Sequence, residues 1–146
     1  MLVSLLGVAA YLLASAWPTL FPPETFNAAA VPGCDLNVEP CVAYFDNGRS
    51  VRLALSPRPL AASRPLDLQV LPAGMAPTGA VAGFSGVDMN MGRLEIPLQS
   101  IDGATFAVQT MLPACIRSQM TWRVVIALDD PQALYRATFE FDVNRR

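Results

Sequence analysis

Lysine and histidine are both missing from these 146 residues, and all ten cationic side chains are arginines. Without an amine or imidazole side chain, the chain cannot form a Ser-His-Asp triad, a lysine Schiff base or a zinc site with imidazole ligands. Charged residues make up only 15% of the chain, and the formal net charge is -2. This balance argues against a protein that neutralises nucleic-acid phosphates. We therefore expect a binding or assembly module rather than an enzyme or a nucleic-acid-binding protein.

The first 21 residues carry no charge, and Glu24 is the first charged residue of the chain. Twenty helical residues cover the roughly 30 Å hydrocarbon layer of a bilayer. Trp17 and Phe21 stand where interfacial aromatic residues lie. Residues 1–21 therefore predict a transmembrane or signal helix. Three alanines at 28–30 offer a cleavage region for a signal peptide, but the length of the apolar run favours an uncleaved anchor.

Either kind of helix exports the remainder of the chain. We therefore expect a single-pass membrane protein whose C-terminal domain lies on the periplasmic or extracellular side. The prolines within residues 22–33 predict a tether between the helix and the domain, with few apolar side chains to bury. Residues 34–146 then form one domain.

Three cysteines lie beyond the apolar segment. In an oxidising compartment, Cys34 and Cys41 are close enough in sequence to form a disulfide. A bond between Cys34 and Cys115 stays open as the alternative, because sequence does not fix disulfide connectivity. An unpaired Cys115 is either a ligand for a soft metal or a buried inert thiol.

Short runs of alternating apolar and polar residues, broken by turn residues about every ten positions, begin after residue 40. Asn47-Gly48 predicts a tight hairpin turn, and Asp129-Asp130-Pro131 is interpreted as a polar turn rather than a calcium or acid/base pair. The pattern predicts an all-β fold, a two-sheet sandwich of about seven strands, with a small closed barrel as the alternative. The expected strands are 41–45, 49–55, 66–71, 80–91, 93–98, 105–112, 121–128 and 135–143.

Methionine and cysteine gather in two places late in the chain. Met89 and Met91 are spaced by two, so an extended strand would project both thioethers from one face. Met111, Cys115 and Met120 lie in the segment 111–120, which joins two expected strands. We expect Met89, Met91, Cys115 and Met120 to meet at one end of the sandwich. Uncharged sulfur ligands favour Cu(I) over harder metals.

Core packing is the competing interpretation of these methionines. Met120 shares an apolar face with Trp122, so packing is its stronger interpretation, and the same holds for Met111. Met89 and Met91 lie among aspartate, asparagine and glycine, where packing explains them less well. Met75 is expected in an exposed loop.

Several segments of the second half together resemble a known family. They are 86–92 (GVDMNMG), Gly103 to Phe106, Leu112-Pro113 with Met120-Thr121-Trp122, and 139–143 (FEFDV). From about residue 66 onward the chain is similar to the exported domain of FixH/YtkA-like proteins. Related sandwiches often combine methionine with histidine as ligands, and here cysteine would take that place.

The resemblance implies an immunoglobulin-like sandwich behind one membrane helix, with a role in copper handling for respiratory oxidase assembly. The expected function is therefore Cu(I) storage or delivery to a partner metalloprotein or oxidase subunit. The alternative is a metal-free structural or partner-binding module of a membrane complex.

Overall fold

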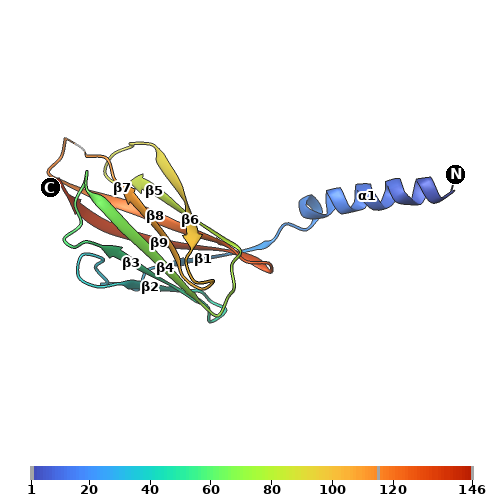
Figure 1. Cartoon of the computed structure of the whole chain (residues 1–146), viewed down its shortest axis with the longest axis horizontal. Coiled ribbons are helices and arrows are strands. Elements are labelled where there is room, and N and C mark those ends of the chain that lie inside the picture. The colour runs from blue at the N-terminus through green and yellow to red at the C-terminus, as the bar shows by residue number, and fades with distance from the viewer. Residues whose placement is uncertain (1, 115, 146) are drawn as a thin grey trace.

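The computed structural model describes residues 2–114 and 116–145. Over these residues the chain forms one helix and nine strands (Figure 1). They are α1 (Leu2–Leu20), β1 (Glu24–Ala29), β2 (Cys41–Tyr44), β3 (Ser50–Ser56), β4 (Pro65–Ala73), β5 (Gly79–Gly86), β6 (Arg93–Ser100), β7 (Phe106–Met111), β8 (Gln119–Asp129) and β9 (Ala133–Asn144).

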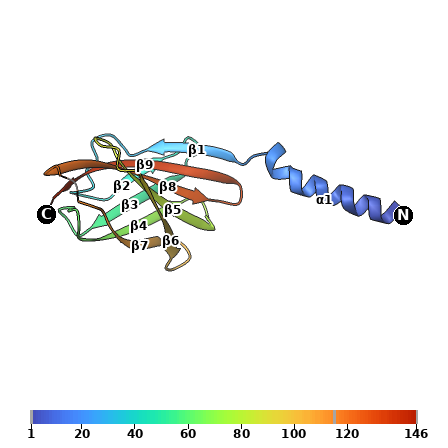
Figure 2. The ribbon, with the colours of Figure 1, turned by 90° about the horizontal axis from the view of Figure 1, so that it is seen from above.

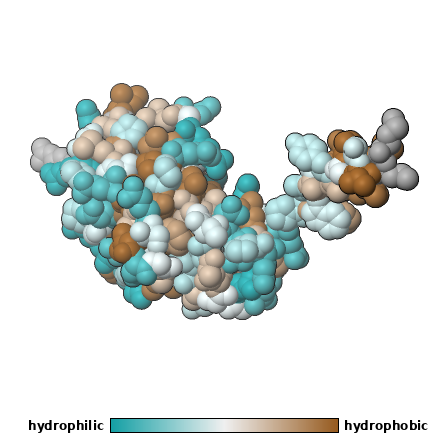
Figure 3. All heavy atoms as spheres, turned by 45° about the vertical axis from the view of Figure 1, so that its right-hand side comes forward, coloured by the Kyte–Doolittle hydropathy of each residue, from teal (hydrophilic) through white to brown (hydrophobic). Residues whose placement is uncertain are grey.

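The helix α1 stands away from the β domain (Figures 1 and 2). Its stretch Val3–Leu20 has a mean hydropathy of 1.6, and none of it is buried inside the structure. It is long and apolar enough to cross a membrane, as the sequence predicts. The rings of Trp17 and Phe21 lie 4.6 Å apart at its C-terminal end. Figure 3 shows apolar residues on the helix, whereas the visible face of the domain mixes hydrophilic and apolar areas.

The strands form one continuous hydrogen-bonded sheet in the order β1-β9-β8-β5-β6-β7-β4-β3-β2. All pairs are antiparallel except β1 with β9. The two end strands approach each other where Ala30 bridges Ala43, which gives the sheet a barrel-like form. The all-β class behind an apolar helix is thus confirmed. The described residues contain nine strands, however, rather than about seven.

Residues 24–29 differ from the tether predicted for 22–33. They form β1, whose six residues pair in register with Ala133 to Thr138 of β9. Phe26 and Ala28 pack against the core. Only residues 21–23 therefore separate α1 from the folded domain.

Alternation along β8 and β9 builds one wall of the core. In β8, every even-numbered residue from Met120 to Leu128 is buried. In β9, every odd-numbered residue from Ala133 to Val143 is buried. Because side chains alternate between the two faces of a strand, this pattern places one face of each strand inward, as predicted.

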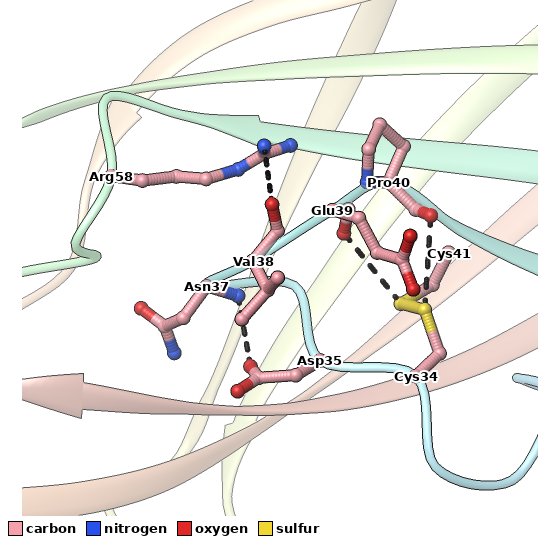
Figure 4. Close-up of a disulfide and its surroundings, with 8 residues drawn as sticks. All are labelled: Cys34, Asp35, Asn37, Val38, Glu39, Pro40, Cys41 and Arg58. Atoms are coloured by element: carbon pink, nitrogen blue, oxygen red, sulfur yellow. Dashed lines mark hydrogen bonds between the residues drawn. A yellow bond between two sulfur atoms is a disulfide. The ribbon is translucent and has the colours of Figure 1, made fainter.

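Cys34 and Cys41 form a disulfide, the pairing favoured by their spacing (Figure 4). The bond closes the connection between β1 and β2. The same connection is tied to the domain by Asn37, whose Oδ1 accepts a bond from the Leu60 amide (2.9 Å) and whose Nδ2 donates to the Asp142 carbonyl (2.9 Å).

Loss of this disulfide is expected to lower the free energy of unfolding by about 2.5 kcal/mol, the loop-closure term for so short a loop. Cys34→Ala/Cys41→Ala tests this by chemical denaturation of the full chain, with Cys115→Ala as the matched control. Alkylation of the non-reduced protein and subsequent mass spectrometry should show no modification of Cys34 or Cys41. Labelling of Cys34 or Cys41 without reductant would contradict the pairing.

The strand directions define two poles of the domain. The proximal pole lies where α1 joins the domain and carries the loops 45–49, 74–78, 101–105 and 130–132. The distal pole lies at the opposite end, near the C-terminus (Figure 1). It carries the connections 31–40, 57–64 and 87–92 and the described part of 112–118.

Candidate functional site

Met120, at the start of β8, points into the core at the distal pole. Met120 is only 4% exposed, and it pairs with Val143 of β9 in the sheet. Its terminal methyl occupies the space that a Cβ would take at Gly86, the last residue of β5. The absence of a side chain at Gly86 is what leaves room for the thioether.

The connection 87–92 folds over this point and brings Met89 beside Met120. The Val87 amide donates to the Thr121 carbonyl (2.9 Å), and the Thr121 amide donates to Asp88 Oδ2 (3.1 Å). The carbonyl oxygen of Met89 lies as close to the position of a Cβ at Gly86 as the methyl of Met120 does. Met89 is half-buried and packs against the core.

Met91 lies in the same connection but is 38% exposed. The expectation that Met89 and Met91 project from one face of an extended strand does not hold, because β5 ends at Gly86 and the chain bends through 87–92. The bend is held by Asn90 Oδ1, which accepts from the Gly92 amide (3.2 Å). Gly92 has a φ of 77°, in the region that favours glycine.

The other sulfur atoms divide between the two poles. Met111 ends β7 at the distal pole, where it pairs with Pro65 and is 51% exposed. Met75 is half-buried at the proximal pole. Cys115 lies outside the described residues. The structure thus places Met89, Met91, Met111 and Met120 at the distal pole.

This arrangement offers soft ligands rather than hard ones. Among the described residues there is no group of three histidine, cysteine, aspartate or glutamate side chains that could hold a metal ion. A buried thioether, a half-buried one and an exposed one lie on adjacent segments instead. Such donors suit a soft monovalent ion, which needs few ligands and no charged oxygen.

Two features of the structure are not apparent from the sequence. One is Gly86, which is required at the junction of β5 with β8. The other is a polar cluster at the proximal pole, where Arg49, Tyr135 and Asp130 lie close together. The turn predicted at Asp129-Asp130-Pro131 is present: Asp130 Oδ2 accepts from the Gln132 amide (3.1 Å).

Among residues 2–114 and 116–145, one carboxyl group has a clearly shifted pKa. Asp102, exposed in the proximal loop 101–105, accepts hydrogen bonds from the backbone amides of Thr105 (2.6 Å) and Ala104 (3.0 Å). These bonds stabilise the ionised form, so the pKa of Asp102 is lowered. Its charge adds to the acidity of the proximal pole.

Comparison with known proteins assigns no family. No protein family and no curated protein matches the sequence. A crystal structure of an engineered protein is similar over 64% of this chain and 19% of that one, with 21% identity and a TM-score of 0.46. The chain thus spans about a fifth of the structure it matches, and a likeness of this size supports no functional argument.

Proposed function

We propose that this chain is a membrane-anchored, exported β domain that binds Cu(I) at its distal pole and hands it to a partner metalloprotein. Met89, Met91 and Met120 are the proposed ligands, with Cys115 as a further one. The observation that carries the proposal is the junction at Gly86, where the connection 87–92 lies against the start of β8.

The graded burial of the three thioethers supports transfer rather than permanent storage. Met120 is nearly enclosed, Met89 is half-buried, and Met91 is exposed. Thioethers bind Cu(I) without forming disulfides in an oxidising compartment. An exposed ligand gives an incoming partner access to the ion, while the buried ligand belongs to a rigid strand.

Retention of α1 as an anchor is supported by the position of β1. Cleavage after Ala30 would remove the six residues of β1 that pair with β9, and with them and Ala30 three side chains that pack against the core. Exposing that edge and core surface would weaken the domain. The uncleaved anchor, with the domain on the exported side, is therefore part of the proposal.

The proposed fold class is an immunoglobulin-like sandwich. The strands β1, β9, β8, β5 and β6 would form one layer and β7, β4, β3 and β2 the other. The strand β6 supports this grouping, because it pairs with β5 from Arg93 to Leu98 and with β7 only at Gln99 and Ser100. A strand that changes partners in this way joins two layers at a corner.

Titration of the full chain with Cu(I), in competition with a chromophoric chelator, tests the metal site. Met89→Leu/Met91→Leu keeps the side-chain volume and should cost little stability. It should weaken Cu(I) binding by at least about a hundredfold, equivalent to ~2.7 kcal/mol. Ascorbate as the reductant leaves the Cys34–Cys41 disulfide intact.

Met75→Leu is the matched control, because Met75 is also a half-buried methionine but lies at the proximal pole. It should bind Cu(I) as the wild type does. Equal affinities for the wild type and Met89→Leu/Met91→Leu would remove these two ligands and, with them, the proposed copper role.

A metal-free partner-binding module is the second candidate, favoured by exposed apolar residues at the distal pole. These are Val87, Met91, Leu94, Met111 and Ile116. Near them the outer edge of β6 is open, because among the described residues its pairing with β7 is limited to two positions. An apolar surface beside an open strand edge is typical of protein docking. Under this alternative, Met120 contributes to the core and binds no metal.

A further inference from the structure

A cavity of about 350 Å³ opens at the proximal pole, between the loop 74–78 and the turn 130–132. A second pocket, of about 190 Å³, adjoins it and extends to Glu24 at the start of β1. Arg49 and Gln132 line both. The two pockets therefore form one recess, with polar and apolar walls, on the face of the domain nearest α1.

The recess lies close to the membrane if α1 spans it. Residues 21–23 are the whole connection between α1 and β1, and three extended residues reach about 10 Å at most. The polar layer on each side of a bilayer is several ångströms thick, roughly 5–8 Å. The recess thus lies at or beside the level of the lipid headgroups, and this inference rests on the retained anchor of the proposed function.

Arg49 supplies a fixed cation to the recess. Its guanidinium donates to the hydroxyl of Tyr135 and to Gln132 Oε1 (3.4 Å), and it lies 5.4 Å from the centre of the Tyr135 ring. Tyr135 is fully buried and stacks on Phe26 (5.2 Å). Both ion pairs found among the described residues lie elsewhere. A guanidinium has five donors, so Arg49 keeps donors available for an anion.

Asp130 supplies a fixed carboxylate to the same recess. It is 9% exposed, and its oxygens accept bonds from the amides of Ala76 (3.1 Å) and Gln132 (3.1 Å). Each carboxylate oxygen has a further lone pair for a cationic ligand. One cation and one carboxylate on the walls of one recess are complementary to a zwitterion.

The surrounding charge excludes an anionic lipid. Arg49 is the one cation in the loops of the proximal pole, all of whose residues are described, and these loops also carry Asp46, Asp102 and Asp130. The aromatic face of Tyr135 is covered by Arg49 and Phe26, so it is not open to a quaternary ammonium, which prefers aromatic faces. A primary ammonium beside a carboxylate fits better.

We propose that this recess binds the headgroup of an ethanolamine phospholipid. The phosphate contacts the guanidinium of Arg49, and the ammonium contacts the carboxylate of Asp130. The contact would fix the orientation of the domain above the bilayer, with its distal pole directed away from the membrane.

The test uses the full chain, reconstituted in bilayers of equal parts phosphatidylethanolamine and phosphatidylcholine. Lipids that stay bound after release from the bilayer are counted by native mass spectrometry. The wild type should retain the ethanolamine lipid about tenfold over the choline lipid, the effect of one contact to a charged group. Arg49→Gln should abolish retention of the ethanolamine lipid. Asp130→Asn should bring the ratio of retained ethanolamine lipid to retained choline lipid close to one.

Arg52→Gln, an exposed arginine on β3 outside the recess, is the matched control and should behave as the wild type. Circular dichroism shows whether Asp130→Asn keeps its fold. Equal retention of both lipids by the wild type, or no change in Arg49→Gln, would overturn the proposal. In a further outcome, the protein in detergent binds free glycerophosphoethanolamine and retains no ethanolamine lipid from the bilayer. That result would show that the ligand is the soluble headgroup compound, and it would contradict the proposal of a membrane lipid.

Two further measurements separate this proposal from the proposed function. The intact mass shows whether α1 is retained. The Cu(I) affinity of Arg49→Gln should equal that of the wild type, because the methionine ligands lie at the opposite pole. If the wild type shows no lipid selectivity but binds Cu(I) normally, the result contradicts the lipid-binding recess and leaves the proposed metal site unaffected.

Discussion

Gly86→Ala should destabilise the full chain by about 3 kcal/mol, in the range of overpacked cores, and should weaken Cu(I) binding at the same time. A Cβ at this position would overlap both the methyl of Met120 and the carbonyl oxygen of Met89. The methionine methyl can turn away, but the carbonyl belongs to backbone held against β8. The connection 87–92 must therefore move. Chemical denaturation monitored by circular dichroism measures the loss of stability.

Gly79→Ala is the matched control on the same strand. No atom lies within 4 Å of a Cβ added at Gly79, so this change should alter stability by no more than about 0.5 kcal/mol. Equal stabilities for the two variants would show that 87–92 does not pack on β8 as described. Loss of stability with unchanged Cu(I) affinity would separate the packing junction from the metal site.

Tyr135→Ala should lower the free energy of unfolding by about 4 kcal/mol, as truncation of a buried aromatic residue does. The Tyr135 ring contacts Phe26 of β1 and Phe45 (5.0 Å) in the turn after β2. Its hydroxyl accepts bonds from Arg49 and from Asn47 Nδ2 (3.0 Å). Truncation removes the side chain that joins three segments at the proximal pole. Chemical denaturation of the full chain provides the measurement.

Two variants divide this effect into packing and hydrogen bonding. Tyr135→Phe keeps the ring and should cost about 1 kcal/mol, the usual net value of a hydrogen bond. Tyr44→Ala, at a 64% exposed tyrosine, should cost less than about 1 kcal/mol. If Tyr135→Ala costs no more than Tyr44→Ala, Tyr135 does not hold β1 and the 45–49 turn together.

Strands with strict alternation are predictable from sequence alone. β8 and β9 each have an uninterrupted apolar face, and the short turn at Asp130 makes them neighbours in the sheet. The hairpin between β2 and β3 is signalled by Asn47-Gly48, and Gly48 has a φ of 83°. In these places the local pattern and the tertiary contacts favour the same structure.

β1 is not predictable in the same way. Its sequence ETFNAA offers only one large apolar side chain, Phe26, and prolines precede it. The strand exists because it lies parallel to β9, a partner more than a hundred residues away. Pairing of this kind leaves little trace in a local pattern.

The location of the sulfur atoms is predictable, but their orientation is not. Counting strands places Met89, Met91 and Met120 at one end of the domain. Their different burial depends on the bend in 87–92 and on the space above Gly86. The Arg49–Tyr135 cluster leaves no local pattern because its members are 86 positions apart.

The copper environment itself provides the most direct test of the proposed metal site. The full chain is loaded with one equivalent of Cu(I), and X-ray absorption is recorded at the copper edge for the wild type and for Met89→Leu/Met91→Leu. We predict a wild-type copper shell of sulfur atoms without nitrogen, and loss of sulfur scattering or of bound copper in the variant. A shell of oxygen or nitrogen atoms, or an identical sulfur shell in the variant, would contradict a thioether site at the distal pole.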